Sequence, residues 1–562
     1  MMLLGLFVLC LAWLLPGHYF PWVSFEQEFA AAVGAVLLGF AAVANARVSR
    51  WPTLAWGVLA CALIPLAQLL AGQVRFISDG VLAAFYLAGF GLCIVIGATL
   101  VRARGADWLE GLAAVLLVAA FVSTGLALLQ WLRLPWLAVF VTDLPPGGRP
   151  YANLAQPNHL AALLALGVAG LLRWYETRRI GGAAAALGVA WFGLGMAMTQ
   201  SRAAWLFAAL VVLAWLALRR RARLRLSGRA LTAGVLAFAA LVLVWGPLNE
   251  ALYLSSPPAL SDRLEPGSRR AVWLALADAA WRARWFGYGW TQVGLAQQAT
   301  ALDHAPIYEY FRNSHNLLLD LVLWNGLPLG VLVAGGLAAW FMRQVRACRD
   351  PGRWAFLLAV SAIFVHSLVE FPLESGYFLV PVGLLMGTLD ALGEGTSAQP
   401  LPRMALALPA LILSALLAWV GIEYVQVQEA ARTLRLVNAR IGLDRVSEAP
   451  VPEVRLLDAP REFHRYVLTE ARIGMKAEEL EWMRAVAQRN AFPPALLRLA
   501  LAAGLNGHPQ EASTILARLC YMHQPARCAE GRKSWAKLQE QYPELRVVHM
   551  PAELPAVTEQ GR

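Results

Sequence analysis

The chain has 562 residues, of which 59% are hydrophobic and only 15% are charged, and its mean hydropathy is +0.55. A soluble domain averages about 25% charged residues, so this composition excludes an ordinary soluble protein. The formal net charge of +11 does not indicate a nucleic-acid surface, because the arginines concentrate in short loops such as 219–225 between apolar runs.

Apolar runs of membrane-spanning length recur from the N-terminus to about Tyr424. They predict an all-α polytopic membrane protein with about thirteen transmembrane helices. The first run has no basic segment before it and no small-residue cleavage site before Pro16, so it is expected to remain as a spanning helix. The expected cores are residues 3–20, 28–46, 53–72, 80–100, 108–131, 159–174, 183–199, 203–218, 230–248, 316–341, 354–370, 376–391 and 404–424.

Arginine-rich and arginine-poor loops alternate along the chain, which predicts the orientation of the spans. The rich loops include Arg47, Arg102, the 219–229 cluster and Arg346, and they are expected to be cytoplasmic. The N-terminus is then inside, and the segment after Tyr424 is outside, in the periplasm of a Gram-negative cell. The unusual polar clusters nearly all fall on the outer side, so chemistry is expected there.

The longest polar interval, residues 246–314, belongs to a predicted transmembrane domain over 1–425 and ends at a histidine. His315 lies between Asn313 and Asn316, where the loop becomes an apolar span. An imidazole at this boundary can exchange protons, and the flanking amides can orient it as a general base. A structural histidine that caps or packs at the helix start fits the pattern equally well.

Three arginines on the outer side are candidates for binding phosphate. Arg202 lies in the short turn after Ser201, and Arg269 and Arg270 open an amphipathic segment expected to lie along the membrane surface. A guanidinium presents a planar fork of donors that suits phosphate. The alternatives are an arginine that extends to the interface from a helix end and a plain interfacial helix.

Two further polar clusters begin or end spans. Gln156, Asn158 and His159 open one span, while His366 and Glu370 lie four residues apart near the outer end of another. They are expected either to line a site or to cap and pair locally. The sequence contains no metal-binding motif, no P-loop and no GxGxxG, so no ATP or dinucleotide cofactor is expected.

Residues 426–562 are expected to form a separate α-helical domain. Short amphipathic helices over 478–489, 494–505 and 510–520 resemble one or two tetratricopeptide-like (TPR-like) hairpins, and residues 450–462 read as a linker. Such helix pairs usually form docking surfaces. Cys520 and Cys528 would form a disulfide if this domain is periplasmic, although two reduced core cysteines remain the alternative.

The ordered set of motifs resembles the bacterial protein O-oligosaccharyltransferases of the PglL/PilO type, within the O-antigen ligase and Wzy polymerase superfamily. The resemblance covers nearly the whole chain. It is carried by Pro16–Trp22 with Phe25 and Glu28, Gln156–Ala161, Ser201–Trp205, Arg269/Arg270 with Trp273, Asn313–Asn316 followed by Gly326–Gly330, His366–Leu373 with Tyr377, and Glu423-Tyr424.

The resemblance implies a metal-independent, inverting glycosyltransferase with a GT-C-like membrane fold in the bacterial inner membrane. It would transfer an oligosaccharide en bloc from undecaprenyl pyrophosphate to a Ser or Thr hydroxyl of an exported protein such as pilin. His315 would be the general base, and Arg202 with Arg269 or Arg270 would stabilise the leaving pyrophosphate. Gln156, Asn158, His159, Asn313, Asn316, His366 and Glu370 are expected to line the site.

Three other functions compete with this interpretation. An O-antigen ligase would use a lipid A core sugar as acceptor, and an O-antigen polymerase would use a second lipid-linked glycan. A transporter of the lipid-linked glycan would carry polar residues on both faces and at mid-membrane. The one-sided distribution of polar clusters favours an enzyme.

Overall fold

The computed structural model describes residues 1–46, 48–134, 139–145, 147–154, 156–252, 254, 267–393, 398–439 and 450–551. Arg47, most of the predicted loop before residue 267, and residues 440–449 and 552–562 of the predicted C-terminal domain lie outside the described residues. The chain divides into two compact units. Unit 1 comprises residues 1–62, 85–262 and 336–419, and unit 2 comprises residues 63–84, 263–335 and 420–562.

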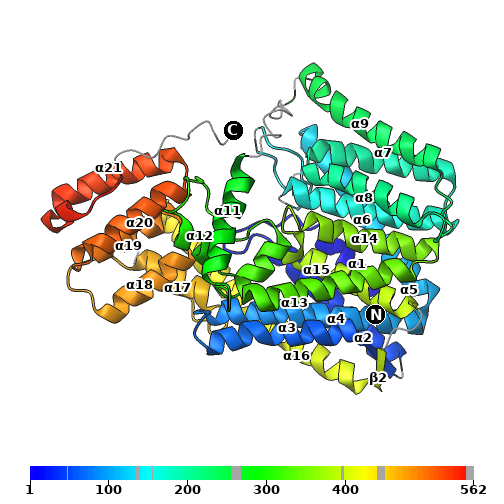
Figure 1. Ribbon diagram of the computed structural model, residues 1–562, viewed down its shortest axis with the longest axis horizontal. Helices are drawn as coiled ribbons and strands as arrows, with labels where there is room; N and C mark the ends of the chain where they lie inside the picture. The colour runs from blue at the N-terminus through cyan, green and yellow to red at the C-terminus, as the bar shows by residue number, and fades with distance from the viewer. Residues whose placement is uncertain are drawn as a thin grey trace. The chain divides into compact units, whose positions relative to one another are not determined.

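Helices dominate the described chain (Figure 1). Those wholly within unit 1 are α1 (Met2–Ala12), α2 (Phe25–Asn45), α5 (Ala106–Trp131), α6 (Pro157–Glu176), α7 (Gly182–Thr199), α8 (Arg202–Leu218), α9 (Gly228–Ala251), α14 (Pro351–His366), the 3-10 turn η2 (Pro372–Glu374) and α15 (Gly376–Leu392). Four long helices contribute residues to both units: α3 (Thr53–Leu70), α4 (Ile77–Arg104), α13 (Leu317–Ala347) and α16 (Met404–Asn438).

Each expected span overlaps one of the helices α1 to α9 or α13 to α16. Among the described residues, eight of these helices are long and apolar enough to cross a membrane, namely α2, α3, α4, α5, α7, α9, α13 and α16. The chain is therefore a multi-pass α-helical membrane protein. The count of thirteen spans stays a prediction, because the other five helices do not meet both requirements.

Two details differ from the predicted all-α pattern. The first expected span, residues 3–20, is helical only to Ala12, because Pro16 lacks an N–H and the Gln27 amide donates to the Leu15 and Gly17 carbonyls, 2.9 and 2.7 Å away. In addition, β1 (Val48–Pro52) and β2 (Ala398–Pro402) form a small antiparallel sheet, with Arg50 opposite Pro400.

Small residues allow close helix crossings inside unit 1. A Cβ at Gly97 of α4 would clash with the backbone of Leu384 in α15, and one at Gly387 of α15 would clash with the backbone of Ile94. The two helices therefore cross with their backbones nearly in contact, as small residues permit in membrane bundles. Nearby, the Trp108 indole of α5 donates to the Thr388 hydroxyl at 2.9 Å.

Unit 2 contains the helices of the long loop and of the C-terminal region. They are α11 (Gly267–Arg282), α12 (Val293–Thr300), α17 (Asp458–Leu468), α18 (Ala477–Arg489), α19 (Pro493–Leu505), α20 (Pro509–Met522), α21 (Pro525–Gln541) and the 3-10 turn η4 (Pro543–Val547). The C-terminal helices, orange to red in Figure 1, stack around a core that includes Leu499, Leu516 and Trp535. The three expected helices are present, and α17 and α21 are additional. The TPR-like assignment stays a prediction.

The expected linker over 450–462 is wrong in its second half, because α17 begins at Asp458. The first half of this expected linker is held in place by hydrogen bonds to carboxylate side chains. The Glu423 carboxylate accepts the N–H groups of residues 455, 456 and 457 at 2.8 to 2.9 Å, and the Asp458 carboxylate accepts those of Ile77 and Ser78 at 2.9 and 2.8 Å. The predicted domain boundary at 425/426 lies within α16.

Candidate functional site

A turn with several hydrogen bonds presents His315 at the start of α13. His315 has a backbone φ of 54°, a left-handed conformation that is uncommon for residues other than glycine. The Asp320 carboxylate accepts the Ser314 N–H at 2.9 Å, and the Asn316 side-chain oxygen accepts the N–H groups of Leu318 and Leu319 at 3.0 and 3.2 Å. Asn316 thus caps α13, and Asp320 connects the first turn of this helix to the preceding loop.

The histidine side chain is half-buried beside an aromatic ring. The imidazole meets the Phe311 ring edge-on, with centroids 5.6 Å apart, while Asn313 and Ser314 on the same turn are buried. The Ser314 hydroxyl donates to the Asn316 carbonyl at 2.9 Å and accepts the Asn316 N–H at 3.1 Å. Asn316 therefore acts in the turn itself, and Asn313 lies within it.

Helix α11, which carries the two candidate arginines, contacts the same turn. The Trp273 indole donates to the Ser314 carbonyl at 2.8 Å. Arg269 and Arg270 precede Trp273 by four and three residues, so both lie one helical turn from this contact. Arg269 is half-buried and Arg270 is exposed. The structure thus brings both predicted phosphate ligands into the neighbourhood of His315.

The C-terminal helices contact the segment that leads to His315. The Tyr521 carbonyl at the end of α20 accepts the N–H groups of Ile307 and Tyr308 at 3.1 and 3.0 Å. The Tyr310 hydroxyl donates to the Arg489 carbonyl at 3.2 Å, and its ring packs edge-on against Phe492, with centroids 5.9 Å apart. The C-terminal helices therefore position residues 307–310, which lie only a few residues upstream of His315.

The two cysteines of the C-terminal region lie next to this contact. Cys520 and Cys528 form a disulfide with an S–S distance of 1.99 Å, joining α20 to α21. Cys520 precedes Tyr521, whose carbonyl accepts from the segment before His315.

Two glycines, Gly287 in the loop and Gly326 in α13, allow the loop backbone to approach a kink in α13 closely. Gly326 has a φ of 78° within this helix, and a Cβ there would clash with the Trp285 backbone. Gly287 has a φ of 71°, and a Cβ there would meet the Leu323 carbonyl. Two backbone hydrogen bonds of 2.7 Å cross this contact, from Tyr288 to Leu323 and from Leu327 to Arg284. Only glycine allows such an approach at these φ angles.

In unit 1, Arg202 occupies the first position of α8. The Ser201 hydroxyl accepts the Ala203 N–H at 3.2 Å, which caps the helix, and donates to the Asn158 side-chain oxygen at 2.7 Å. Gln156 is the N-cap residue of α6, the helix that contains Asn158. The exposed Arg202 guanidinium is thus carried on a turn that Asn158 anchors.

Arg149, which was not among the predicted site residues, belongs to this group. Its guanidinium lies within 3.4 and 3.5 Å of the Thr199 and Gln200 carbonyls. Burial lowers the pKa of Arg149; nearby Glu370 opposes this shift and Arg202 adds to it. An arginine in an otherwise arginine-poor outer loop was the sequence signal that could have identified it.

The remaining candidates in unit 1 cluster around His159, which is buried. Its Nδ1 lies 2.7 Å from the Tyr377 hydroxyl, and the ring meets Phe371 and Phe378 edge-on at 5.6 Å. His366 and Glu370 are buried within electrostatic range of His159. The Glu370 N–H donates to the His366 carbonyl at 2.9 Å.

The predicted site residues therefore form two groups, one in each unit. Unit 2 contains His315, Asn313, Asn316, Arg269 and Arg270, while unit 1 contains Arg202, Gln156, Asn158, His159, His366 and Glu370. Sequence reasoning about the site missed Asp320, which is buried in an apolar run. Such a carboxylate is costly unless it is paired, and that cost was the available signal.

Three family models match parts of the chain. A model described as O-antigen ligase matches residues 187–334, one described as protein glycosylation ligase matches 150–174, and one for the C-terminal region of virulence factor membrane-bound polymerases matches 354–542. They cover His315, Arg202 and the start of α6.

Two curated relatives from Acinetobacter baylyi match across both units. The general O-oligosaccharyltransferase is 30% identical over 411 residues, which is 72% of each chain. The ComP-specific O-oligosaccharyltransferase is 27% identical over 390 residues, covering 69% of this chain and 70% of the relative. The chain therefore belongs to the O-oligosaccharyltransferase family of membrane glycosyltransferases.

Proposed function

We propose that this enzyme transfers an oligosaccharide en bloc from undecaprenyl pyrophosphate to a Ser or Thr hydroxyl of an exported protein such as pilin. The observation that carries the proposal is the turn that presents His315 beside the arginine-bearing end of α11. The family supports a lipid-linked donor and a protein acceptor. The arginine distribution supports a bacterial inner-membrane location with the site and the C-terminal region in the periplasm.

His315 is the proposed general base. Its imidazole would take the proton of the acceptor hydroxyl as that oxygen bonds to the anomeric carbon. The bond from this carbon to the pyrophosphate oxygen breaks at the same time, and the electron pair leaves with the pyrophosphate. Attack opposite the leaving group would invert the anomeric configuration. The half-buried position of His315 leaves part of the ring accessible to a hydroxyl.

The arginines are proposed to neutralise the charge that develops on the pyrophosphate. Arg269 or Arg270 would act from α11, and Arg202 from the start of α8. Preorganised charged donors aimed at a leaving group typically account for about a hundredfold or more in rate. These guanidinium groups would supply the stabilisation that a divalent cation could provide, so the proposed reaction is metal-independent. Gln156, Asn158, His159, Asn313, Asn316, His366 and Glu370 are proposed to line or shape the site.

A cellular assay would test the proposed reaction. The chain would be expressed in a bacterium that makes the undecaprenyl-linked glycan but lacks its own ligase and protein glycosyltransferase, with pilin and lipid A core both present. We expect a pilin mass increase that His315→Ala and Arg202→Ala each abolish. Arg349→Ala, an exposed arginine on a predicted cytoplasmic loop, is the matched control and should leave the mass increase unchanged.

The second candidate function is O-antigen ligation or polymerisation, because two of the matching family models describe an O-antigen ligase and a polymerase. Glycan on lipid A core without a pilin mass change would establish ligase activity. Longer lipid-linked glycan without either product would establish polymerase activity. Full activity in both variants would refute the roles assigned to His315 and Arg202.

A further inference from the structure

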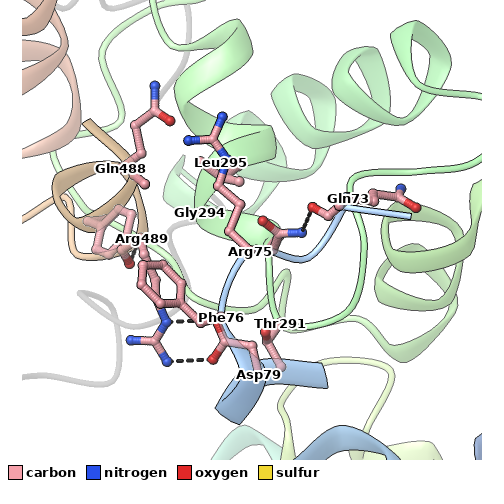
Figure 2. Close-up of a pocket in the computed structure, with 13 residues that line it drawn as sticks. Gln73, Arg75, Phe76, Asp79, Thr291, Gly294, Leu295, Gln488 and Arg489 are labelled. Atoms are coloured by element: carbon pink, nitrogen blue, oxygen red, sulfur yellow. Dashed lines mark hydrogen bonds and ion pairs between the residues drawn. The ribbon is translucent and has the colours of Figure 1, made fainter. Parts of the chain in front are cut away.

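Unit 2 contains a cavity of about 220 Å³ that is lined by both polar and apolar residues and that the reaction described above does not use (Figure 2). Its walls come from the connection between α3 and α4 with the start of α4, from α12 with the residues just before it, from Tyr310, and from α18. Polar residues of the lining include Gln73, Thr291, Gln292 and Gln488. A glutamine amide both donates and accepts hydrogen bonds, so it suits a ligand that does the same.

The charged groups of this cavity are already paired. Arg489 makes a two-pronged contact with the Asp79 carboxylate, at 2.7 Å from Nε and 2.6 Å from the terminal nitrogen. Arg75 pairs with Glu481 at 3.0 Å. Since each guanidinium is matched by a carboxylate, the two pairs carry no net charge that would favour an anionic ligand. The cavity is therefore suited to an uncharged ligand.

Two of the glutamines have their amide N–H groups engaged. Gln73 donates to the Phe286 and Gly287 carbonyls at 3.1 and 2.9 Å, and Gln292 donates to the Gln73 and Tyr288 carbonyls at 2.8 and 2.7 Å. These bonds orient both side chains, and the Gln73 amide extends away from the other labelled residues (Figure 2). The Gln292 amide oxygen is therefore the acceptor to which a ligand hydroxyl group would be a suitable donor.

Gln488 is the most adaptable member of the lining. Within the described part of the chain, its side-chain amide makes no hydrogen bond. Figure 2 shows Gln488 and Arg75 extending away from the Asp79–Arg489 pair at the bottom of the view. The Gln488 amide can therefore both donate to and accept from a bound hydroxyl group.

The cavity does not match the common modes of peptide recognition. These modes use a sheet edge, an apolar groove for a helix, an aromatic groove for a proline-rich segment or a cluster of available arginines. The described elements lining this cavity are helices and loops, and its arginines are paired. Neutral amides in a small cavity match the hydroxyl groups of a sugar ring, which both donate and accept hydrogen bonds.

We propose that this cavity binds an uncharged sugar unit of the transferred glycan, remote from the bond that is broken. The inference rests on the proposed function for the identity of the ligand. Tyr310 lines the cavity and lies five residues before His315. Five residues span at most about 18 Å, so one glycan can reach both places. The cavity would thereby select donors whose glycan is long enough.

Two donors of different length test this inference with the full-length enzyme in lipid nanodiscs. One lipid pyrophosphate carries a single sugar, and the other carries the complete oligosaccharide. We expect Gln488→Ala to raise the KM for the long donor about fivefold to tenfold, the effect of losing one good hydrogen bond. The same variant should leave the KM for the single-sugar donor unchanged. Gln510→Ala, on the exposed surface of α20, is the matched control.

Gln488→Met is a second variant, because it retains the side-chain length without the hydrogen-bonding groups, and thermal unfolding would verify that both variants fold. An unchanged KM for the long donor in both folded variants would overturn the inference. Equal penalties for both donors, or a rise only in the KM for an acceptor peptide, would also overturn it. The latter result would assign the cavity to the acceptor protein.

A binding experiment separates this inference from the proposed function. The probe is the oligosaccharide released by mild acid from the lipid carrier of the expression host, and saturation-transfer NMR detects its binding. Binding that Gln488→Ala weakens supports the cavity even if the enzyme glycosylates no protein. Transfer by the wild type without any such binding would retain the proposed function and overturn the sugar site.

Discussion

The Asp320 carboxylate accepts the Ser314 N–H at 2.9 Å, from six residues further along the chain. This bond closes the loop onto the first turn of α13 with His315 between its two ends. A left-handed backbone at a residue other than glycine costs on the order of 1–3 kcal/mol and persists only where its surroundings determine it. Asp320, with the Asn316 cap and the Trp273 indole, provides those surroundings.

Replacing Asp320 should impair catalysis without weakening donor binding. Asp320→Ala leaves the Ser314 N–H without its acceptor and loosens the turn, so we expect kcat to fall about a hundredfold, as for a displacement of roughly 1 Å. Asp320→Asn retains an oxygen acceptor and should lose much less. Initial rates with purified enzyme would measure both variants. Equal losses would show that the negative charge, rather than the geometry, is what matters.

The contact between the C-terminal helices and residues 307–310 should be needed for activity. Phe492→Ala removes the ring that packs against Tyr310, so we expect at least a tenfold loss of kcat through displacement of the segment before His315. Tyr310→Phe, which loses only the hydroxyl, should have a smaller effect. Phe463→Ala, which packs in the same helical region, controls for general destabilisation. An equal loss in that control would contradict the specific contact.

Gly326 should tolerate no side chain. Gly326→Ala combines a φ of 78° with a clash against the Trp285 backbone. We therefore expect the free energy of unfolding to fall by about 1–3 kcal/mol from the backbone strain, with the clash adding to this loss. Gly335→Ala is the matched control in the same helix, because a Cβ there meets no atom within 4 Å. It should be neutral or slightly stabilising. Thermal unfolding in detergent would compare the two, and similar midpoints would contradict the close approach.

Acidification should weaken the C-terminal helices through His523. Burial lowers the pKa of this side chain from 6.5, although donation from Nε2 to the Ala491 carbonyl at 2.7 Å opposes the shift. As the pH falls through 6.5 the unfolded chain takes up a proton before the folded one does, so stability is lost as the pH drops below about 6.5. His523→Gln retains a donor without titrating there. It should show a shallower pH dependence of the unfolding midpoint.

Local signals in the sequence were sufficient for many elements. Hydropathy and helix signals depend on neighbouring residues, so the helices over 478–489, 494–505 and 510–520 could be expected from sequence alone. The same applies to the loop ending at His315 and to Arg202 at a helix start. The failure at residues 13–20 has a local cause, because Pro16 interrupts an otherwise apolar run.

Only the tertiary structure revealed the contacts that shape the candidate site. Asp320 acts through a turn whose closure depends on a left-handed residue, and hydropathy does not encode that conformation. Arg489 and Tyr521 contact the loop from positions about two hundred residues away, while Glu370 lies within electrostatic range of Arg149 across a similar separation. Which distant side chains meet depends on how the helices pack. The sequence determined the kind of protein and its central histidine, whereas packing decided what positions that histidine.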